Sequence, residues 1–197
     1  MFMDIRTLQK IAGLCGILAP IVAYIFIFIS IANAPWFTWQ HNALSDLGAH
    51  AGSDITFNFG LMAAGILELI FSIGLFLHFK DILSRIGSIF LIVDSIALFA
   101  IGYFPETAGI IHYYVSVVFF VMFPLGYLIF TVALFKNSKD KLLCIVAFIA
   151  AIASIIIWST PWESFGITGV AIPEFLSSLF GASWVVLMSW YLYKERQ

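Results

Sequence analysis

IAGLCGILAPIVAYIFIFISIANA, residues 11–34, is a run of 24 residues without a charged side chain. The hydrocarbon core of a bilayer is about 30 Å thick, and an α-helix needs about 20 apolar residues to cross it. Because a backbone in lipid must satisfy its own hydrogen bonds, such a run is expected to be helical. Five similar runs follow, so the predicted membrane spans are residues 11–34, 55–79, 86–104, 110–135, 142–160 and 172–193.

These spans predict an all-α polytopic membrane protein, a six-helix transmembrane bundle in which residues 1–197 form a single domain. The composition agrees, because 62% of the residues are hydrophobic and 10% are charged, whereas soluble domains carry about 25% charged residues. The net charge of −2 excludes the clustered Lys and Arg residues that nucleic-acid binding requires. Membrane lipids are the expected partners, and a homo-oligomer or a larger membrane complex stays open.

The basic residues predict how the chain is oriented. All 9 Lys and Arg residues lie before the first span, between the second and third, between the fourth and fifth, or after the sixth. The other three connections contain none. Loops rich in Lys and Arg face the cytoplasm. The sequence therefore predicts a multi-pass protein of the cell membrane with cytoplasmic N- and C-termini.

The opposite, outer side carries acids and imidazoles without cationic partners. Asp46 lies in the first outer connection, Glu106 lies at a helix junction, and His112 lies three residues into the fourth span. These three residues could bind a divalent metal, as zinc is bound by carboxylate and imidazole, or His112 could act as a general base oriented by a carboxylate. The alternative is a structural hydrogen-bond network that joins the outer helix ends. Other candidates on this side are Ser45 as a catalytic residue and Asn58, Ser116 and Glu174 as ligand-binding residues.

Two acids lie deep in the predicted membrane region, Glu68 in the second span and Asp94 in the third. Each costs roughly 2.5–3.5 kcal/mol on insertion scales. At about 1.5 Å rise per residue, both lie at similar depth on an antiparallel hairpin, where they could meet. We interpret them as candidate ligand-binding residues, either a proton relay or the polar wall of a substrate cavity. The alternative is a neutral, hydrogen-bonded carboxyl pair that fixes the helix register.

Several short segments resemble the family known as domain of unknown function 998. They are residues 44–48 (LSDLG), 57–61 (FNFGL), 104–106 (FPE) and 172–174 (IPE), together with His112 and Ser116. The resemblance implies a small archaeal or bacterial membrane protein of about six spans, without an assigned activity. Ser45, Asp46 and Gly48 also bear a fainter likeness to the Frag1 and damage-regulated autophagy modulator group. Gly48 is expected to occupy a turn that tolerates positive φ.

Three functions are compatible with the sequence, which contains no motif that specifies a reaction. The first is an outer pocket around Asp46, Glu106, His112 and Glu174 that binds a lipid headgroup, a small polar ligand or a metal and could hydrolyse its ligand. The second is a proton-coupled small transporter that uses the two deep acids. The third is a structural or assembly subunit of a membrane complex.

Overall fold

The computed structural model describes residues 5–137 and 140–194. Within these ranges the chain forms long α-helices and short 3-10 helices, without a strand. Six helices are long and apolar enough to cross a membrane, which confirms the predicted all-α class. The long helices are α1 (Ile5–Ala32), α2 (Asp54–His78), α3 (Ile82–Tyr103), α4 (Ile110–Asn137), α5 (Lys141–Ser159) and α6 (Ala171–Lys194), and the 3-10 helices are η1 (Ser45–Gly48), η2 (Glu106–Ala108) and η3 (Trp162–Phe165).

The predicted spans match the helices within a few residues, except at two starts. Helix α1 begins at Ile5 rather than at residue 11, and its first turns are held by a contact with α2, where Gln9 Nε2 lies 2.8 Å from His78 Nδ1. Helix α3 begins four residues early because the Asp81 carboxylate accepts a hydrogen bond of 2.9 Å from the Ser84 N–H. Apolar runs locate the part of a helix that lies in lipid, whereas caps and contacts set its ends.

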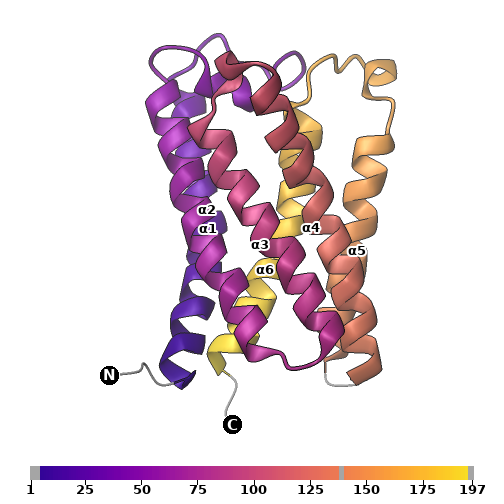
Figure 1. Ribbon diagram of the computed structural model, residues 1–197. Coiled ribbons are helices and arrows are strands. Elements are labelled where there is room, and N and C mark those ends of the chain that lie inside the picture. The colour runs from indigo at the N-terminus through magenta and orange to yellow at the C-terminus, as the bar shows by residue number, and fades with distance from the viewer. Residues whose placement is uncertain (1–4, 138–139, 195–197) are drawn as a thin grey trace.

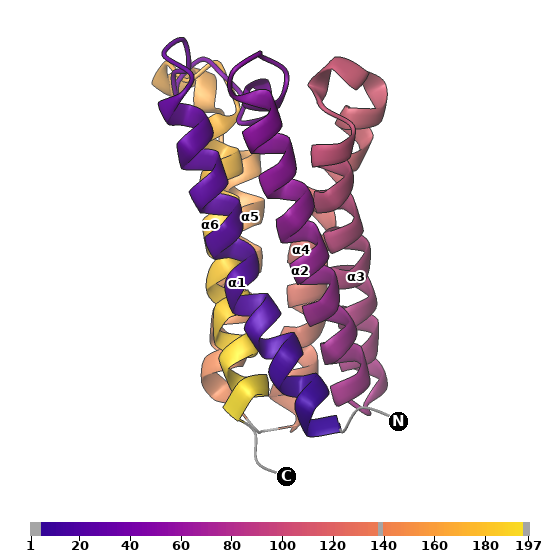
Figure 2. The same cartoon turned by 90° about the vertical axis from the view of Figure 1, so that its left-hand side faces the viewer.

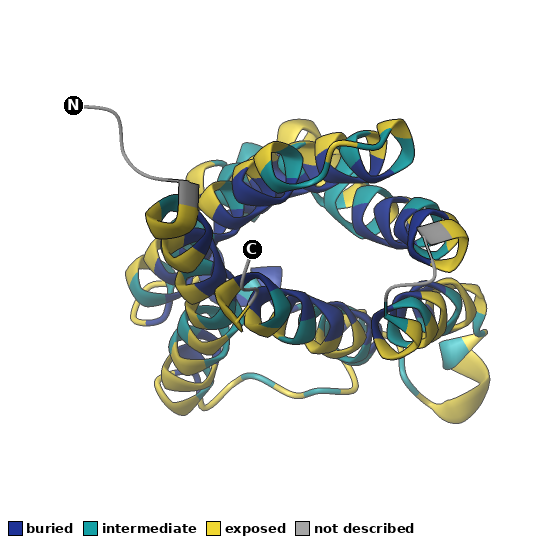
Figure 3. Cartoon of the chain, turned by 90° about the horizontal axis from the view of Figure 1, so that it is seen from below, coloured by how far each residue is buried: buried dark blue, intermediate teal, exposed yellow. Residues whose placement is uncertain are grey.

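The six long helices follow one another around a ring (Figure 1 and Figure 2). Each helix packs against the next in sequence, and α6 closes the ring by packing against α1. Viewed along the bundle, the buried faces point inward and the exposed faces outward (Figure 3). The outward faces carry large apolar side chains such as Ile25, Phe28, Ile66 and Ile96, as expected for helices that contact lipid.

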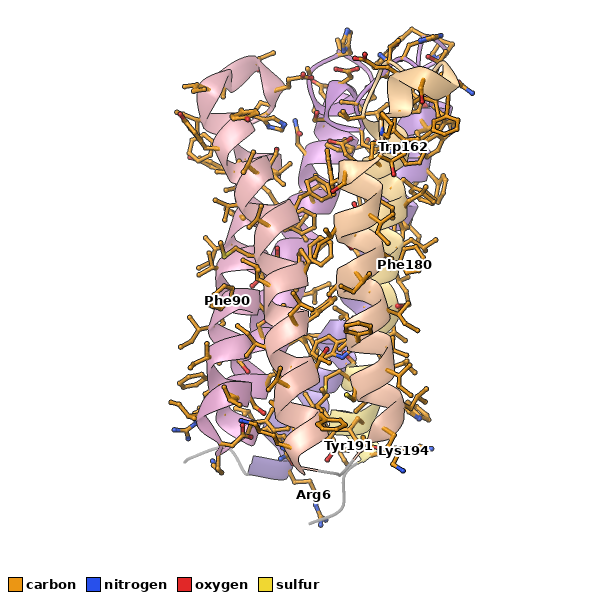
Figure 4. The ribbon with its side chains drawn as sticks, turned by 90° about the vertical axis from the view of Figure 1, so that its right-hand side faces the viewer. Arg6, Phe90, Trp162, Phe180, Tyr191 and Lys194 are labelled. Carbon is orange, nitrogen blue, oxygen red and sulfur yellow. The ribbon has the colours of Figure 1, made fainter. Side chains whose placement is uncertain are left out.

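The two ends of the bundle differ in charge. Both described chain ends, the α2–α3 turn, the end of α4 and the start of α5 lie at one end, here called the proximal end, and η1, η2 and η3 lie at the other, the distal end (Figure 1). Arg6 and Lys194 mark the proximal end and Trp162 the distal end (Figure 4). Every described Lys and Arg residue belongs to the proximal part of its helix or to a proximal connection.

Two clusters of buried side chains fill the bundle. The proximal cluster contains Trp184, which is fully buried and whose ring lies 4.5 Å from the ring of Tyr127 and 4.9 Å from that of Phe130, tilted against both. The distal cluster is built around Leu47 and Phe57. Phe123 and Tyr127 of the proximal cluster also line the cavity that holds the candidate site.

Candidate functional site

The connection between α1 and α2, residues 33–53, folds over the distal end and is here called the distal loop. The Leu44 N–H donates a hydrogen bond of 2.6 Å to Glu174 Oε2 at the start of α6. The Ala171 N–H donates to the Asn42 carbonyl over 2.8 Å. At the other side, Asn58 Nδ2 on α2 donates to the Gly48 carbonyl over 2.9 Å. These bonds hold η1 between α2 and α6.

Position 48 needs a glycine because there is no room for a side chain, and not because of its backbone conformation. The described glycines with positive φ are Gly52, Gly109 and Gly166, so the expectation of positive φ at Gly48 was wrong. A Cβ atom at this position would overlap the Asn58 side chain and lie 2.9 Å from the Phe57 ring. The close approach of η1 to α2 explains the glycine.

Asp46 and Glu106 join η1 to η2 at the distal end. Their side chains share a hydrogen bond, and Asp46 Oδ2 also accepts from Asn42 Nδ2 at 2.7 Å and from the Ala43 N–H at 3.0 Å. Two carboxyl groups can share such a bond only when one carries a proton. A pair joined in this way consists of a carboxylic acid bound to a carboxylate.

The surroundings assign the proton to Glu106. Burial, the hydrogen bond with Asp46 and the Asp46 charge raise the pKa of Glu106 to about 7, against a weaker opposing effect of His50. For Asp46, burial acts to raise the pKa, but hydrogen bonds from Glu106, Asn42 and the Ala43 N–H outweigh it, and the pKa falls below its ordinary value. Opposite shifts in two adjacent acids are typical of a shared proton.

His112 is engaged elsewhere. Its ring is buried, and Nδ1 lies 2.8 Å from the Phe104 carbonyl oxygen. Because a carbonyl only accepts, Nδ1 carries the hydrogen and the bond closes the α3–α4 connection. The expected set of His112, Asp46 and Glu106 is not assembled as a metal site, since no group of three His, Cys, Asp or Glu side chains within residues 5–137 and 140–194 could hold a metal ion.

A cavity of about 120 Å³ lies in the distal half of the bundle, lined by α1, η1, α2, α3, α4 and α6. Five of the predicted site residues line it. Its described lining residues do not include Asp46, Asn58, Glu106 or His112. The tertiary structure thus divides the predicted residues into two groups. One group, Asp46, Asn58, Glu106 and His112, lies outside the cavity. The other group lines it and contains Ser45, Glu68, Asp94, Ser116 and Glu174.

The two deep acids lie on neighbouring helices of this cavity, Glu68 on α2 and Asp94 on α3. Asp94 is 1% exposed and Glu68 is 9% exposed, and both line the cavity. Neither carboxyl oxygen of Asp94 has a hydrogen-bond partner among the described residues. An isolated polar group in an apolar interior costs free energy unless something pairs with it. Asp94 is therefore the group of the cavity that requires a partner from outside the chain.

Aromatic residues that were not predicted from the sequence complete the walls. Phe119, Phe123 and Tyr127 occupy one face of α4 together with the predicted Ser116, a pattern that follows from the 3.6-residue period. Tyr127 Oη donates to the Gly181 carbonyl over 2.9 Å, which ties α4 to α6 at the deep end of the cavity. Tyr24 lines the cavity from α1, on a face that also carries Pro20 and Ile27 at helical spacing.

The fold and the cavity define a polytopic α-helical membrane protein with buried acids in an internal cavity. A family model described as "Protein of unknown function (DUF998)" matches residues 17–191. The chain therefore belongs to this family, and the predicted resemblance is confirmed. The fainter likeness to the Frag1 group stays a prediction. Comparison with curated proteins and with solved structures finds no match.

Proposed function

We propose that this protein is a membrane carrier that binds a small ligand in its internal cavity and couples the passage of that ligand to protonation of Glu68 and Asp94. The observation that carries the proposal is the Asp94 carboxyl group, which is 1% exposed, lacks a partner among the described residues and borders the cavity. Acidic residues inside membrane spans are rare because they are costly, and they mark substrate or proton pathways.

The position of the cavity supports the proposal. The deep acids lie near the middle of α2 and α3, and Ser45 and Glu174 lie where the cavity approaches the distal end. A ligand that enters from the distal end would meet both acids near the middle of the bundle. A change in their protonation would alter the binding of the ligand, which is the coupling that a carrier needs.

Hydrolysis at the distal end has less support. The His112 Nδ1–H group is used by the Phe104 carbonyl, and Asp46 is held by Glu106, Asn42 and Ala43. Ser45 lines the cavity instead. Ser45, His112 and Asp46 thus do not act on one site, and the pair of Asp46 and Glu106 is better described as a link between η1 and η2.

The distribution of charge supports a location and an orientation as part of this proposal. The described Lys and Arg residues are confined to the proximal end, and loops rich in these residues face the cytoplasm, which supports placing this end on the cytoplasmic side of a cell membrane. Lipids then cover the outward apolar faces. A second copy of the chain or a larger complex would have to replace lipid on these same faces.

The proposal is tested with full-length protein in liposomes that contain a pH-sensitive dye. The probes are benzylammonium, benzyl alcohol and benzoate, which share a ring but differ in charge. For at least one probe, we expect protons to cross the membrane faster in liposomes that contain the protein than in protein-free liposomes. Asp94→Asn and Glu68→Gln should abolish this movement, and Glu163→Gln, at an exposed acid on η3, should retain it. Equal rates with and without wild-type protein for all three probes would overturn the carrier function.

A further inference from the structure

The polar groups deep in the cavity act as acceptors of hydrogen bonds when Asp94 and Glu68 are ionised, because an ionised carboxyl group only accepts. The Tyr127 hydroxyl hydrogen is directed to the Gly181 carbonyl over 2.9 Å, so its oxygen can only accept from a ligand. The oxygen atoms at the deep end can therefore still accept hydrogen bonds from a ligand, but they have no hydrogen left to donate to it.

The same situation occurs along the wall formed by α1 and α6. Ser178 Oγ donates to the Phe175 carbonyl over 2.9 Å. Tyr24 Oη lies 3.2 Å from Ser178 Oγ, and because the serine hydrogen is already used, the tyrosine hydroxyl is the donor of this bond. Two more hydroxyl hydrogens are thus consumed by the protein itself. A ligand must bring its own donors to bind these groups well.

The charge of the cavity has one sign. Its described lining residues include the acids Glu68, Asp94 and Glu174 and contain no Lys, Arg or His. Walls of low dielectric constant focus the field of such charges on the space between them. An anion would be repelled, and a neutral ligand would leave any ionised acid without a counter-charge.

The remaining walls are apolar and aromatic. Phe119, Phe120 and Phe123 of α4 face the cavity together with aliphatic side chains such as Leu61 and Leu98. Aromatic faces attract cations and pack against apolar bodies. The volume of about 120 Å³ is close to that of an apolar cavity of about 150 Å³ that accepts a benzene molecule. The space therefore suits one ring or a branched chain of similar size.

We infer that the cavity binds a small primary ammonium compound with a compact apolar body, its ammonium group between Asp94 and Glu68 and its body against the phenylalanine rings of α4. A primary ammonium group supplies three N–H donors and one positive charge, which matches the acceptors and the charge of the deep end. Asp94 then gains the partner that the chain does not provide. This inference rests on the proposed function, since it names the class of ligand that the same cavity takes.

The test measures binding of benzylammonium, benzyl alcohol and benzoate to the full-length protein in detergent by isothermal titration calorimetry at pH 8. We expect benzylammonium to bind at least tenfold more tightly than benzyl alcohol, and benzoate to give no saturable heat. Asp94→Asn should remove this tenfold preference while binding of benzyl alcohol stays within about twofold of wild type. Glu163→Gln should behave as wild type, which controls for nonspecific attraction of amines to surface charge.

The outcomes separate the inference from the function on which it rests. Equal binding of the alcohol and the ammonium compound, or tighter binding of benzoate, would overturn the ammonium class and leave the cavity as a ligand site. Binding of benzylammonium without proton movement in liposomes would overturn the carrier and leave the ligand class in place. If none of the probes binds to wild-type protein, both fail. Should Asp94→Asn not fold, Glu68→Gln provides the second variant, with the same loss of preference expected.

Discussion

The side chains of Asp46 on η1 and Glu106 on η2 share a hydrogen bond at the distal end of the bundle, although the two residues belong to different connections. The bond requires one proton for two carboxyl groups. It joins the distal loop, which covers the cavity from the side of α1, α2 and α6, to the α3–α4 connection. The strength of this link must depend on pH.

Stability should follow the protonation of this pair. The pKa of Glu106 is about 7 in the folded protein against an ordinary 4.5, so the folded state binds more protons between these values, and the free energy of unfolding falls as the pH rises from 4.5 to 7. The lowered pKa of Asp46 acts in the opposite direction, because its contribution is lost as the pH falls below the ordinary 3.8. We expect the Tm in detergent to decrease between pH 5 and pH 8.

Glu106→Gln separates this pair from the other groups that titrate. The amide can donate to Asp46 at every pH, so the decrease in Tm between pH 5 and pH 8 should become shallower than in wild type. Glu163→Gln removes an exposed acid on η3 and should leave the slope unchanged. An identical slope in wild type and Glu106→Gln would show that the pair does not hold the proton.

His112 should matter for stability and not for metal content. His112→Ala removes the donor to the Phe104 carbonyl, which leaves a half-buried acceptor unpaired and costs about 1–3 kcal/mol of unfolding free energy. His112→Asn, whose amide can reach a similar position to Nδ1–H, should recover part of the loss. Elemental analysis by mass spectrometry should give equal metal content for wild type and His112→Ala, and a metal lost only in the variant would contradict the assignment.

Gly48→Ala should loosen the distal loop. The added Cβ overlaps the Asn58 side chain and crowds Phe57, and such overpacking costs about 1–3 kcal/mol. The matched experiment is a double-mutant cycle with Asn58→Ala, which creates room beside the new methyl group. The two substitutions should be less destabilising together than the sum of their separate effects, as measured by thermal unfolding. If the two destabilising effects simply add, the new Cβ atom does not clash with the Asn58 side chain.

Replacing the unpaired acid should raise stability at the expense of binding. Asp94→Leu removes a carboxyl group without a partner among the described residues from an apolar interior, and the gain should be about 1–3 kcal/mol. Such an exchange of stability against activity is common at functional sites. Tyr127→Phe is the control, because it deletes the bond to the Gly181 carbonyl and should lower the Tm. A lower Tm for Asp94→Leu would identify Asp94 as a structural residue.

Much of the architecture was predictable because its causes are local. The thickness of a bilayer and the need of each backbone segment to satisfy its own hydrogen bonds act within one span, and all six spans were found. Their ends were less exact, since Asp81, which caps α3, and Gln9, which contacts His78, lie outside the apolar runs. The deep acids were recognised for the same local reason, because a carboxyl group in an apolar run is costly wherever the helix packs.

The grouping of the polar residues was decided by the tertiary structure. Asp46, Glu106 and His112 lie at similar predicted depth, but the rotation of α4 and the path of the distal loop direct His112 to the Phe104 carbonyl and Asp46 to Glu106. Depth follows from position along a span, whereas rotation depends on contacts between helices distant in sequence. The sequence alone determined the membrane-spanning helices and the presence of buried acids. Only the packed bundle determined which of these groups face a common cavity, because a cavity is formed by several helices and is encoded in none of them separately.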